Sequence, residues 1–370
     1  MNRGAFTFYE FFAGGGMARL GLGETWRCLF ANDFDPRKAA AYRANFGGED
    51  FHQGDVWGLH PADAPGRADL AWASSPCQDL SLAGARAGLA GDRSSAFFGF
   101  WWLMEALAGQ DRAPRAIVIE NVAGLFSSRR GRDFEAVCAA LAGAGYRFGA
   151  LEIDAALYLP QSRTRCVVIA TLEAPPARLV GQVPGRAVAE AKARLPAALK
   201  ARWIDWRLAP PPRRNCDLAA LLEPDEAVRW RTAGETAALI AQMDGANLLR
   251  LEAALASGER RVGAAFRRMR AGRQRTETRF DGLAGCLRTP GGGSSRQFIL
   301  VAEAGEVRSR LLSPREAARL MGLPDSYRLP GAATAGLHLA GDGVAVPMVR
   351  HLAAEILEPL LAPEPSRAAA

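Results

Sequence analysis

The stretch Phe6-Thr7-Phe8-Tyr9-Glu10-Phe11-Phe12-Ala13-Gly14-Gly15-Gly16-Met17 decides the fold. Its first part, Phe6–Phe12, has the aromatic and apolar content of a buried strand, and the glycines after it predict a tight turn that leads into a helix. A glycine turn at the carboxyl end of a strand lets a ligand approach the backbone closely. Arg19 stands where the dinucleotide fingerprint GxGxxG requires a glycine, so this turn does not predict a nicotinamide cofactor.

Strand-like and helix-like stretches alternate from the N-terminus to about residue 170. The further strand-like runs are Trp26–Ala31, Leu70–Ala73, Ala116–Ile119 and Cys166–Thr171, and helix-compatible stretches such as Pro36–Phe46 and Phe134–Ala144 lie between them. Alternation of this kind is typical of βαβ units. We therefore predict an α/β fold with a Rossmann-like, mostly parallel sheet and helices on both of its faces.

The middle of the chain is richer in proline, arginine and glycine, which predicts a smaller and less regular second domain. Regular structure returns where Ser313-Pro314-Arg315-Glu316 forms a capping-box pattern. Further on, one helix face carries Val349, Leu352, Ala353, Ile356 and Leu357, and this apolar face has to pack on another surface. We expect a first domain over 1–172, a second over 173–340, a helix over 341–358 that returns to the first, and a flexible tail over 359–370.

The composition excludes several classes of protein. Of the 370 residues, 49% are hydrophobic and 23% are charged, and no apolar run approaches the ~18 residues that a membrane span needs. The N-terminus lacks the long apolar segment of a secretion signal, and the six cysteines form no CxxC pair, which favours a reducing cytoplasm and disfavours a zinc ribbon. The net charge of +7 favours a polyanionic partner, although the arginine bias of a GC-rich genome explains it equally well.

Two acids follow predicted strands at the edge where an adenosine-containing ligand would bind. Asp33 stands about 20 residues beyond the glycine turn, where a ribose hydroxyl is usually bound, and Phe34 beside it could stack on an adenine. Asp55 stands at the next strand end and could accept from an adenine amino group. On the residues alone, an ordinary strand-end acid, a core phenylalanine and a turn aspartate remain the alternatives.

A second group of residues has the chemistry of a catalytic site. Cys77, in Ser75-Pro76-Cys77-Gln78, follows a strand on a proline-stiffened loop, where a nucleophilic thiol can be partly exposed. Glu120 emerges from an apolar strand, where poor solvation favours the protonated carboxyl group. Arg163 and Arg165, two apart, can point the same way and offer cationic donors to a carbonyl oxygen or a thiolate.

The ordered motifs FFAGGG, NDFD, PCQ, ENV, QSRTR, SPREAARLMGLPDSY and GDGVAV resemble those of the bacterial DNA cytosine-5 methyltransferases. The resemblance covers both ends of the chain, roughly 6–171 and 308–358. The chain departs from the family's pattern at Glu10, where aspartate is usual, at Ser74-Ser75, where Gly-Phe is usual, and at Asp342, where asparagine is frequent.

The resemblance implies S-adenosylmethionine as the methyl donor, S-adenosylhomocysteine as the product, and no metal. The implied cofactor-binding residues are Phe12, Ala13, Gly14, Gly16, Asp33, Phe34, Asp55, Val56, Pro76, Asp342 and Val344. It also implies that Cys77 adds to C6 of cytosine while Glu120 holds a proton at N3, and that Arg163 and Arg165 hold the base O2 and the thiolate. Because C5 cannot be reached inside a duplex, the cytosine has to flip out.

Double-stranded DNA is the implied partner, and arginines gather in the expected second domain. Eight arginines and one acid, Glu277, lie between positions 260 and 279, which suits phosphate contacts, with a solvated arginine-rich surface helix as the alternative. Glycines before Arg296 and Gln297 permit close approach, and these residue types suit guanine and adenine edges. The candidate DNA-binding residues are Gln78, Arg267, Arg268, Arg270, Arg288, Arg296 and Gln297.

Two other functions are compatible with these motifs. An RNA cytosine-5 methyltransferase of the transfer-RNA type shares this catalytic core, but the long insert between QSRTR and SPREAAR favours DNA. A catalytically inactive DNA-binding relative is disfavoured by the intact Cys77, Glu120 and Arg163. We expect sequence-specific DNA methylation in the bacterial cytoplasm, at the nucleoid and without membrane association. The enzyme would serve either an orphan epigenetic role or a restriction-modification system with a cognate restriction endonuclease.

Overall fold

The computed structural model describes residues 5–76, 96–289 and 296–363. Two compact units are present. Unit 1 contains the described residues of Met1–Ile153, Thr164–Pro210 and Met348–Ala370, and unit 2 contains those of Asp154–Arg163 and Pro211–Pro347. The divisions at residues 210 and 347 lie later in the sequence than the expected boundaries at 172 and 340, and the short segment Asp154–Arg163, within the expected first domain, belongs to unit 2.

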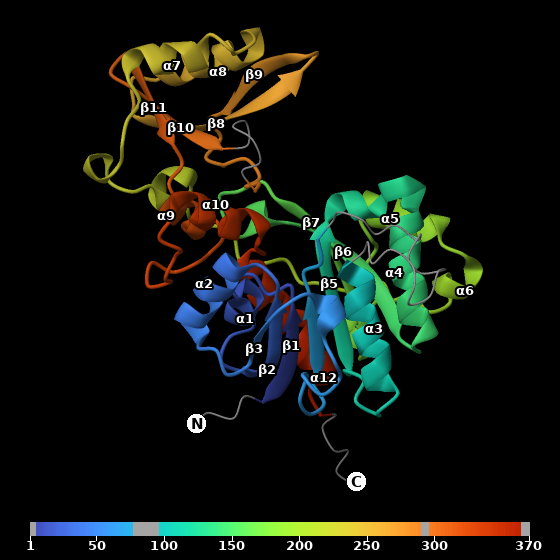
Figure 1. Ribbon diagram of the computed structural model, residues 1–370. Helices are drawn as coiled ribbons and strands as arrows, with labels where there is room; N and C mark the ends of the chain where they lie inside the picture. Colours follow the sequence, from blue (N-terminus) through green and yellow to red (C-terminus); the bar gives the residue numbers. More distant parts are fainter. Residues whose placement is uncertain (1–4, 77–95, 290–295, 364–370) are drawn as a thin grey trace, which may run out of the picture. The chain divides into compact units, whose positions relative to one another are not determined.

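Unit 1 is built on a seven-stranded sheet in the order β3-β2-β1-β4-β5-β7-β6 (Figure 1). Pairing is parallel from β3 through β5, and β7 runs antiparallel to β5. The α/β fold class is therefore confirmed. The strands are β1 (Phe6–Phe11), β2 (Trp26–Asp33), β3 (Phe51–Gln53), β4 (Leu70–Ala73), β5 (Ala116–Val122), β6 (Arg147–Asp154) and β7 (Thr164–Thr171).

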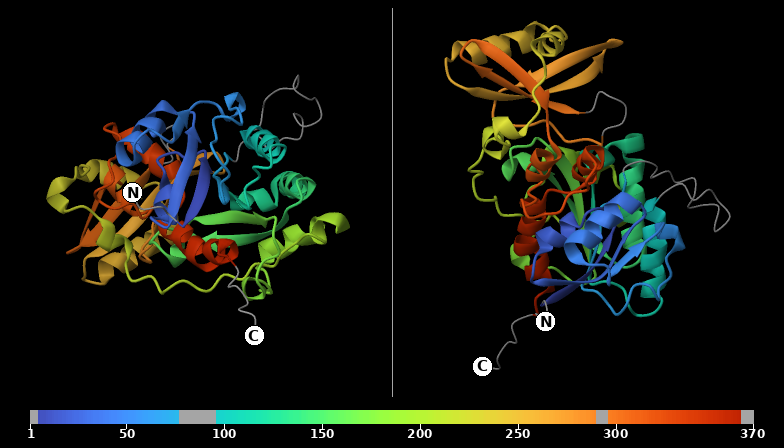
Figure 2. Two further views of the ribbon diagram at one scale, coloured as in Figure 1. Left: turned by 90° about the horizontal axis from the view of Figure 1, so that it is seen from below. Right: turned by 60° about the vertical axis from the view of Figure 1, so that its left-hand side comes forward.

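Helices pack on both faces of this sheet (Figure 2). Tyr9, Phe11 and Ile119 share one core cluster with α3 and α4, whereas Ala31 packs with Tyr42 of α2 in a separate cluster. The predicted helix Pro36–Phe46 is present with the same bounds, because Asp35 caps its first amides. The helices of unit 1 are α1 (Met17–Leu22), α2 (Pro36–Phe46), α3 (Ala96–Ala108), α4 (Arg132–Gly143), α5 (Arg186–Arg194) and α6 (Ala197–Lys200).

The C-terminal helical segment buries the apolar face that the sequence pattern identified. It runs through α11 (Val346–Leu352), a π-helical turn (Ala353–Leu357) and α12 (Glu358–Leu361). All five residues of the apolar face are 0–1% exposed. The indole nitrogen of Trp26 in β2 donates to the carboxylate of Glu358 at 3.0 Å, which ties this segment to the sheet of unit 1.

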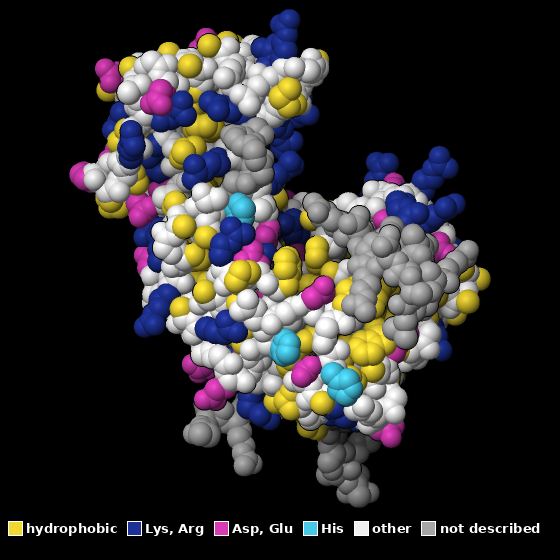
Figure 3. Space-filling view, in the orientation of Figure 1, with side chains coloured by type: hydrophobic (Ala, Val, Ile, Leu, Met, Phe, Trp, Pro, Cys, Tyr) yellow, Lys and Arg dark blue, Asp and Glu magenta, His cyan; other side chains and the backbone are white. Residues whose placement is uncertain are grey.

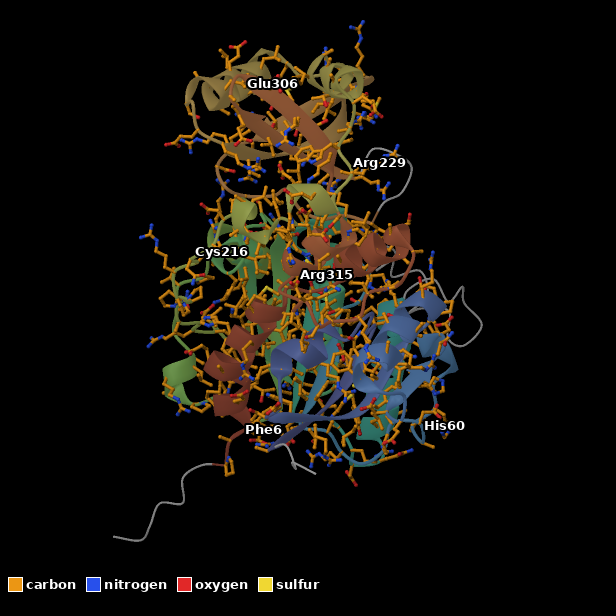
Figure 4. All side chains as sticks on the ribbon, turned by 90° about the vertical axis from the view of Figure 1, so that its left-hand side faces the viewer. Phe6, His60, Cys216, Arg229, Glu306 and Arg315 are labelled. Atoms are coloured by element: carbon orange, nitrogen blue, oxygen red, sulfur yellow. The ribbon has the colours of Figure 1, made fainter. Side chains whose placement is uncertain are left out.

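Unit 2 contains a four-stranded antiparallel sheet in the order β11-β10-β8-β9. Its strands are β8 (Arg261–Arg270), β9 (Arg273–Arg279), β10 (Gln297–Glu303) and β11 (Glu306–Leu311), and its helices are α7 (Ala233–Ile240), α8 (Gly245–Ala256), α9 (Pro314–Arg319) and α10 (Ala333–Asp342). The arginine-rich stretch is thus a β-hairpin, and the alternative of a surface helix is wrong. Glu306, which begins β11, is labelled in Figure 4.

The predicted capping box is present at the start of α9. Ser313 accepts from the Glu316 amide, and the Glu316 carboxylate accepts from the Ser313 amide. The same carboxylate also receives a bidentate pair of hydrogen bonds from Arg310, at 2.6 and 2.7 Å, and both side chains are almost fully buried. Both Glu316 oxygens are thus engaged by Arg310 and by the Ser313 cap, and this cluster fixes the approach of β11 to α9.

Among the described residues, no helix is both long enough and apolar enough to cross a bilayer.

Candidate active site

Six strand ends of unit 1 bring their functional side chains to one edge of the sheet. In parallel strands the carboxyl ends lie together, which places the residues after β1, β2, β3, β4 and β5 along this edge. Phe6, at the beginning of β1, marks the opposite edge in Figure 4. Since β7 runs the other way, its first residues reach the same edge, and Arg165 is paired with Val122 at the end of β5.

The turn after β1 has the backbone conformation that its glycines predict. Phe12, Gly14 and Gly16 have φ values of 56°, 57° and 76°. A Cβ on Gly16 would lie 2.4 Å from the ring of Phe46, so the position requires glycine. A Cβ on Gly14 would meet none of the described residues within 4 Å, so they leave this part of the turn open. The amide of Ala13 donates to the carbonyl of Asn32 at 2.9 Å, which joins the turn to the end of β2.

Asp33 and Phe34, at the end of β2, differ sharply in exposure. The Asp33 carboxylate is buried and accepts from the amides of Gly14 and Asp35, both at 2.9 Å. Burial raises the pKa of Asp33 above its ordinary value. The ring of Phe34 is 67% exposed, so it is not the core phenylalanine that was the alternative.

Asp55 caps the short helical turn that follows β3. Its carboxylate accepts from the amide of Trp57 at 3.0 Å, while Val56 is buried. Asn32 holds this segment in place, because its amide donates to the carbonyls of His52 and Gly54 at 3.0 and 2.9 Å. Asp55 is therefore a turn aspartate, as in the alternative considered above. Its second carboxylate oxygen takes no part in the hydrogen bond to Trp57.

These residues fit S-adenosylmethionine by the chemistry of their side chains. Each Asp33 oxygen accepts one backbone amide and keeps acceptor capacity for a ribose hydroxyl, since a carboxylate has about four lone-pair sites. The exposed ring of Phe34 can stack on adenine, and the open space at Gly14 admits a ligand to the backbone.

Glu120 and Arg165 form an ion pair at this edge. Arg165 Nε lies 3.0 Å from Glu120 Oε1, and both residues are buried. They come together because Arg165 pairs with Val122, two residues beyond Glu120, and alternate residues of a strand share one face. Arg165 therefore orients the Glu120 carboxylate and supplies its counter-charge.

Asn121 fixes the segment after β4. Its amide nitrogen donates to the carbonyl and to the hydroxyl of Ser75, at 3.1 and 3.2 Å, and both residues are buried. Pro76, next in sequence, is exposed. Cys77 and Gln78 follow directly and lie outside the described residues.

Arg163 belongs to unit 2, and its side chain organises that unit. Its guanidinium donates to the carbonyls of Leu287, Gly341 and Gly343 at 2.9, 3.0 and 2.6 Å. Gln161 acts in the same way, since its amide donates to the carbonyl of Leu320 at 2.7 Å and accepts from the amide of Leu287 at 3.1 Å. Two residues of the QSRTR motif therefore hold the segment before Arg288 in place.

The cofactor candidates near the C-terminus also lie in unit 2. Val344 is 3% exposed, and Asp342 accepts a hydrogen bond from the hydroxyl of Thr289. Arg288, beside Thr289, is exposed.

The DNA-binding candidates fall into distinct environments. Arg267 faces the helices, with its guanidinium 5.1 Å from the ring centre of Phe298, whereas Arg268 and Arg270 face the other side and pair with Glu277 at 3.2 and 2.6 Å. Gln297 is 6% exposed.

The side-chain amide of Gln297 is engaged by the backbone of Gly285. It accepts from the Gly285 amide at 3.0 Å and donates to the Gly285 carbonyl at 2.8 Å. Arg296, the residue before it, is partly exposed.

Three positioning residues were missed by sequence reasoning: Asn32, Asn121 and Gln161. All three lie within motifs that the sequence analysis quoted, and all three use a side-chain amide to bridge backbone groups. Their residue type was a signal, because a buried amide normally has hydrogen-bond partners. Which backbone groups they reach could not be read from the sequence.

Known sequences resemble this chain along nearly its whole length. The protein-family model described as C-5 cytosine-specific DNA methylase matches residues 6–358 of this chain. The type II methyltransferase M.NlaX of Neisseria lactamica is 27% identical over 357 residues, which are 95% of this chain and 96% of that protein. M.DsaV of Dactylococcopsis salina, also a type II methyltransferase, is 27% identical over 359 residues, or 96% of this chain and 87% of that protein.

Solved structures share the fold. The Dnmt2 methyltransferase of S. pombe has a TM-score of 0.60 and 18% identity, covering 96% of this chain and 99% of that one. The methyltransferase EhMeth of Entamoeba histolytica has a TM-score of 0.60 and 15% identity, covering 96% of this chain and 97% of that one. With a sheet of this order, a glycine turn and acid suited to S-adenosylmethionine, and a sequence match from residue 6 to 358, the chain belongs to the C-5 cytosine-specific DNA methylase family.

Proposed function

We propose that this enzyme methylates C5 of a flipped-out cytosine in a specific double-stranded DNA sequence, with Cys77 as the covalent nucleophile. The observation that carries the proposal is the buried Glu120–Arg165 pair beside Ser75. Cys77 follows Ser75 and Pro76 directly in the sequence, and the anchored end of β4 lies beside β5, which carries the Glu120 acid.

The proposed chemistry begins at the base. The Cys77 thiolate adds to C6, the C5=C6 double bond opens, and the electron pair is delocalised toward O2 and N3. A proton held by Glu120 at N3 stabilises that charge, and C5 becomes a nucleophilic enamine carbon. When bound, S-adenosylmethionine would supply an electrophilic methyl group to C5, with its sulfonium sulfur leaving as the neutral thioether of S-adenosylhomocysteine. Loss of the C5 proton and elimination of the Cys77 thiolate then restore the aromatic ring.

The remaining residues would serve this reaction as follows. Asp33 and Phe34 would hold the ribose and the adenine of the methyl donor, beside the turn at Gly14. Arg165 keeps the Glu120 carboxylate in one orientation, which suits a group that has to meet N3 at hydrogen-bond distance. The three carbonyl partners of Arg163 favour a positioning role for that guanidinium over the contact to base O2 that the resemblance implies.

Expression in a host without cytosine methylation, followed by bisulfite sequencing, tests the substrate. We expect 5-methylcytosine at every copy of one short sequence motif. A purified enzyme that methylates transfer RNA and leaves duplex DNA unmodified would overturn the proposal in favour of the RNA alternative.

Covalent trapping tests the nucleophile. Duplex DNA that contains 5-fluorocytosine should trap the wild-type enzyme, because fluorine does not leave C5 as a proton does, while Cys77→Ala should give no adduct. Cys138→Ala is the matched control, since that thiol is buried in the core of unit 1 and should leave trapping intact. An adduct that persists in Cys77→Ala rules out the assignment.

We also propose a role in a restriction-modification system, which the type II names of the curated relatives support. DNA methylated by this enzyme should resist a restriction endonuclease that cuts at the motif found by bisulfite sequencing. Full cleavage of completely methylated DNA by every endonuclease of that specificity would favour the orphan role.

A further inference from the structure

The β8–β9 hairpin of unit 2 continues past the rest of its sheet as a two-stranded ribbon. The last residue of β8 that pairs with β10 is Phe266, opposite Gln297. Beyond it, the pairing of β8 with β9 continues from Arg267–Thr276 to Arg270–Arg273. We call residues 267–276 the ribbon; it is the tip of the hairpin labelled β8 and β9 in Figure 1.

The two faces of the ribbon carry different side chains, because successive residues of a strand point to opposite sides. The register places Arg268 opposite Arg275 and Arg270 opposite Arg273, so four arginines share one face. We call this the arginine face. The other face carries Met269 opposite Gln274 and Arg267 opposite Thr276.

Among the residues that the structure describes, the rest of unit 2 holds the ribbon at its base. Thr276 is fully buried, and its amide donates to the carbonyl of Gln242 at 3.0 Å. Toward the tip the exposure rises, with the Arg268 and Arg270 side chains 39% and 59% exposed and Met269 61% exposed. Dark-blue side chains are frequent around this hairpin in the space-filling view (Figure 3).

The charge of the arginine face favours a polyanion. Like charges directly opposite each other across two strands are unfavourable, and this face contains two such pairs in succession. Glu277 offsets part of that repulsion, through its pairs with Arg268 and Arg270. A bound polyanion would relieve the remaining repulsion between these arginines. Anion binding therefore explains the charge of the arginine face better than a purely structural role does.

We propose that the ribbon enters the major groove of duplex DNA with its arginine face toward the base edges, where it reads guanine. This inference rests on the proposed function and names the element that selects the site. The major groove of B-form DNA admits a two-stranded ribbon, and arginine donates bidentately to guanine O6 and N7 there. Any duplex site that contains a cytosine presents a guanine on the opposite strand. The deep, narrow major groove of an RNA duplex excludes such an element.

The test compares binding to the enzyme's own motif with binding to the same duplex carrying 7-deazaguanine, which lacks only N7. We expect the wild-type enzyme to bind the 7-deazaguanine duplex more weakly for each guanine that an arginine reads bidentately, by at most the roughly 150-fold that a complete bidentate contact is worth. The variant Arg270→Gln/Arg273→Gln should bind the ordinary duplex more weakly and should show little further weakening on the modified one. Its melting temperature should match that of the wild type, because the tip lies beyond the rest of the sheet.

The matched control removes the same charge elsewhere. Arg178→Gln/Arg186→Gln changes two exposed arginines of unit 1 and should keep the full wild-type sensitivity to 7-deazaguanine. If the ribbon variant also keeps that sensitivity, or if the wild type has none, the inference is overturned. A ribbon variant that weakens binding to an RNA duplex of the same sequence equally also overturns it. A wild type that methylates no duplex DNA overturns the proposed function itself, which separates the two failures.

Discussion

The Nε atom of Arg165 lies 3.0 Å from Oε1 of Glu120, and the two side chains are only 10% and 7% exposed. The pair joins two strands that run in opposite directions, β5 and β7, at the edge of the sheet that carries the glycine turn. Removing one member of a buried ion pair leaves the charge of the other uncompensated, so a single substitution in this pair should change the free energy of unfolding measurably.

Arg165→Ala should destabilise unit 1 by about 3–5 kcal/mol, because it leaves the buried Glu120 carboxylate without its counter-charge. Urea unfolding measures this change. Glu120→Gln is the comparison: it removes the acid, but its amide oxygen can still accept a hydrogen bond from Arg165, so it should abolish methyl transfer at a smaller cost in stability than Arg165→Ala. Equal stability of Arg165→Ala and the wild type would contradict the role given to this pair.

Glu10 gives the chain a pH-dependent stability. Burial raises the pKa of Glu10 to about 8, from an ordinary value of 4.5, although its carboxylate accepts from the amide of Arg19 at 3.3 Å. The groups that face it are Arg19 of α1, Cys28 of β2, Tyr42 of α2 and Asp50 before β3.

The raised pKa means that the folded chain holds this proton more tightly than the unfolded chain does. The stabilisation from Glu10 is therefore complete below about pH 4.5 and is lost as the pH rises to about 8, at about 1.4 kcal/mol for each pH unit. Glu10→Gln should lack this slope, so the difference between the wild-type and variant free energies of unfolding, measured in urea, should change across that window by about 1.4 kcal/mol for each pH unit. Parallel curves for the variant and the wild type would show that Glu10 does not titrate there.

Both hairpins of unit 2 turn through an Ala-Gly pair with positive φ. Ala271 and Gly272 have φ values of 48° and 74°, and Ala304 and Gly305 have values of 50° and 80°. A left-handed conformation costs alanine about 1–2 kcal/mol, and asparagine tolerates it better. Ala271→Asn and Ala304→Asn should each raise the midpoint of thermal unfolding, and their effects should add because the turns are separate. Ala220→Asn, outside both hairpins, should give no such gain.

The C-terminal segment should be indispensable for unit 1. Ile356 is fully buried, so Ile356→Ala should lower the free energy of unfolding by about 2–5 kcal/mol, whereas Glu355→Ala on the exposed side should change it little. Deleting residues 341–370 should destroy folding or cofactor binding, and deleting 362–370 should have little effect. A folded, active chain that ends at residue 340 would refute this expectation.

We expect Gln297 to stabilise the fold of unit 2 and not to read a base. Its amide is engaged by both backbone groups of Gly285, so Gln297→Ala should leave buried polar groups unsatisfied at a cost of about 1–3 kcal/mol. If Gln297 reads a base instead, the variant should methylate a relaxed motif with unchanged stability. Thermal unfolding and bisulfite sequencing of the same variant distinguish the two.

The sequence by itself determined the elements with strong local signals. The strand Leu70–Ala73 and the helix Pro36–Phe46 have the expected bounds, because an unbroken apolar run and an aspartate cap before a proline are local features. The capping box at Ser313 and the apolar face through Ile356 follow from the same kind of signal. The order of the motifs also identified the family.

Only the tertiary structure decided which residues meet. The direction of β7 follows from packing against β5, and that reversal brings Arg165 to Glu120 while Arg163, two residues earlier, donates to carbonyls of unit 2. The arginine-rich stretch has no apolar periodicity to distinguish a helix from a strand, and its pairing with β10 decides that it is a hairpin. Strand register then separates Arg267 from Arg268 and Arg270, because alternate side chains point to opposite faces and register depends on partners far away in the sequence.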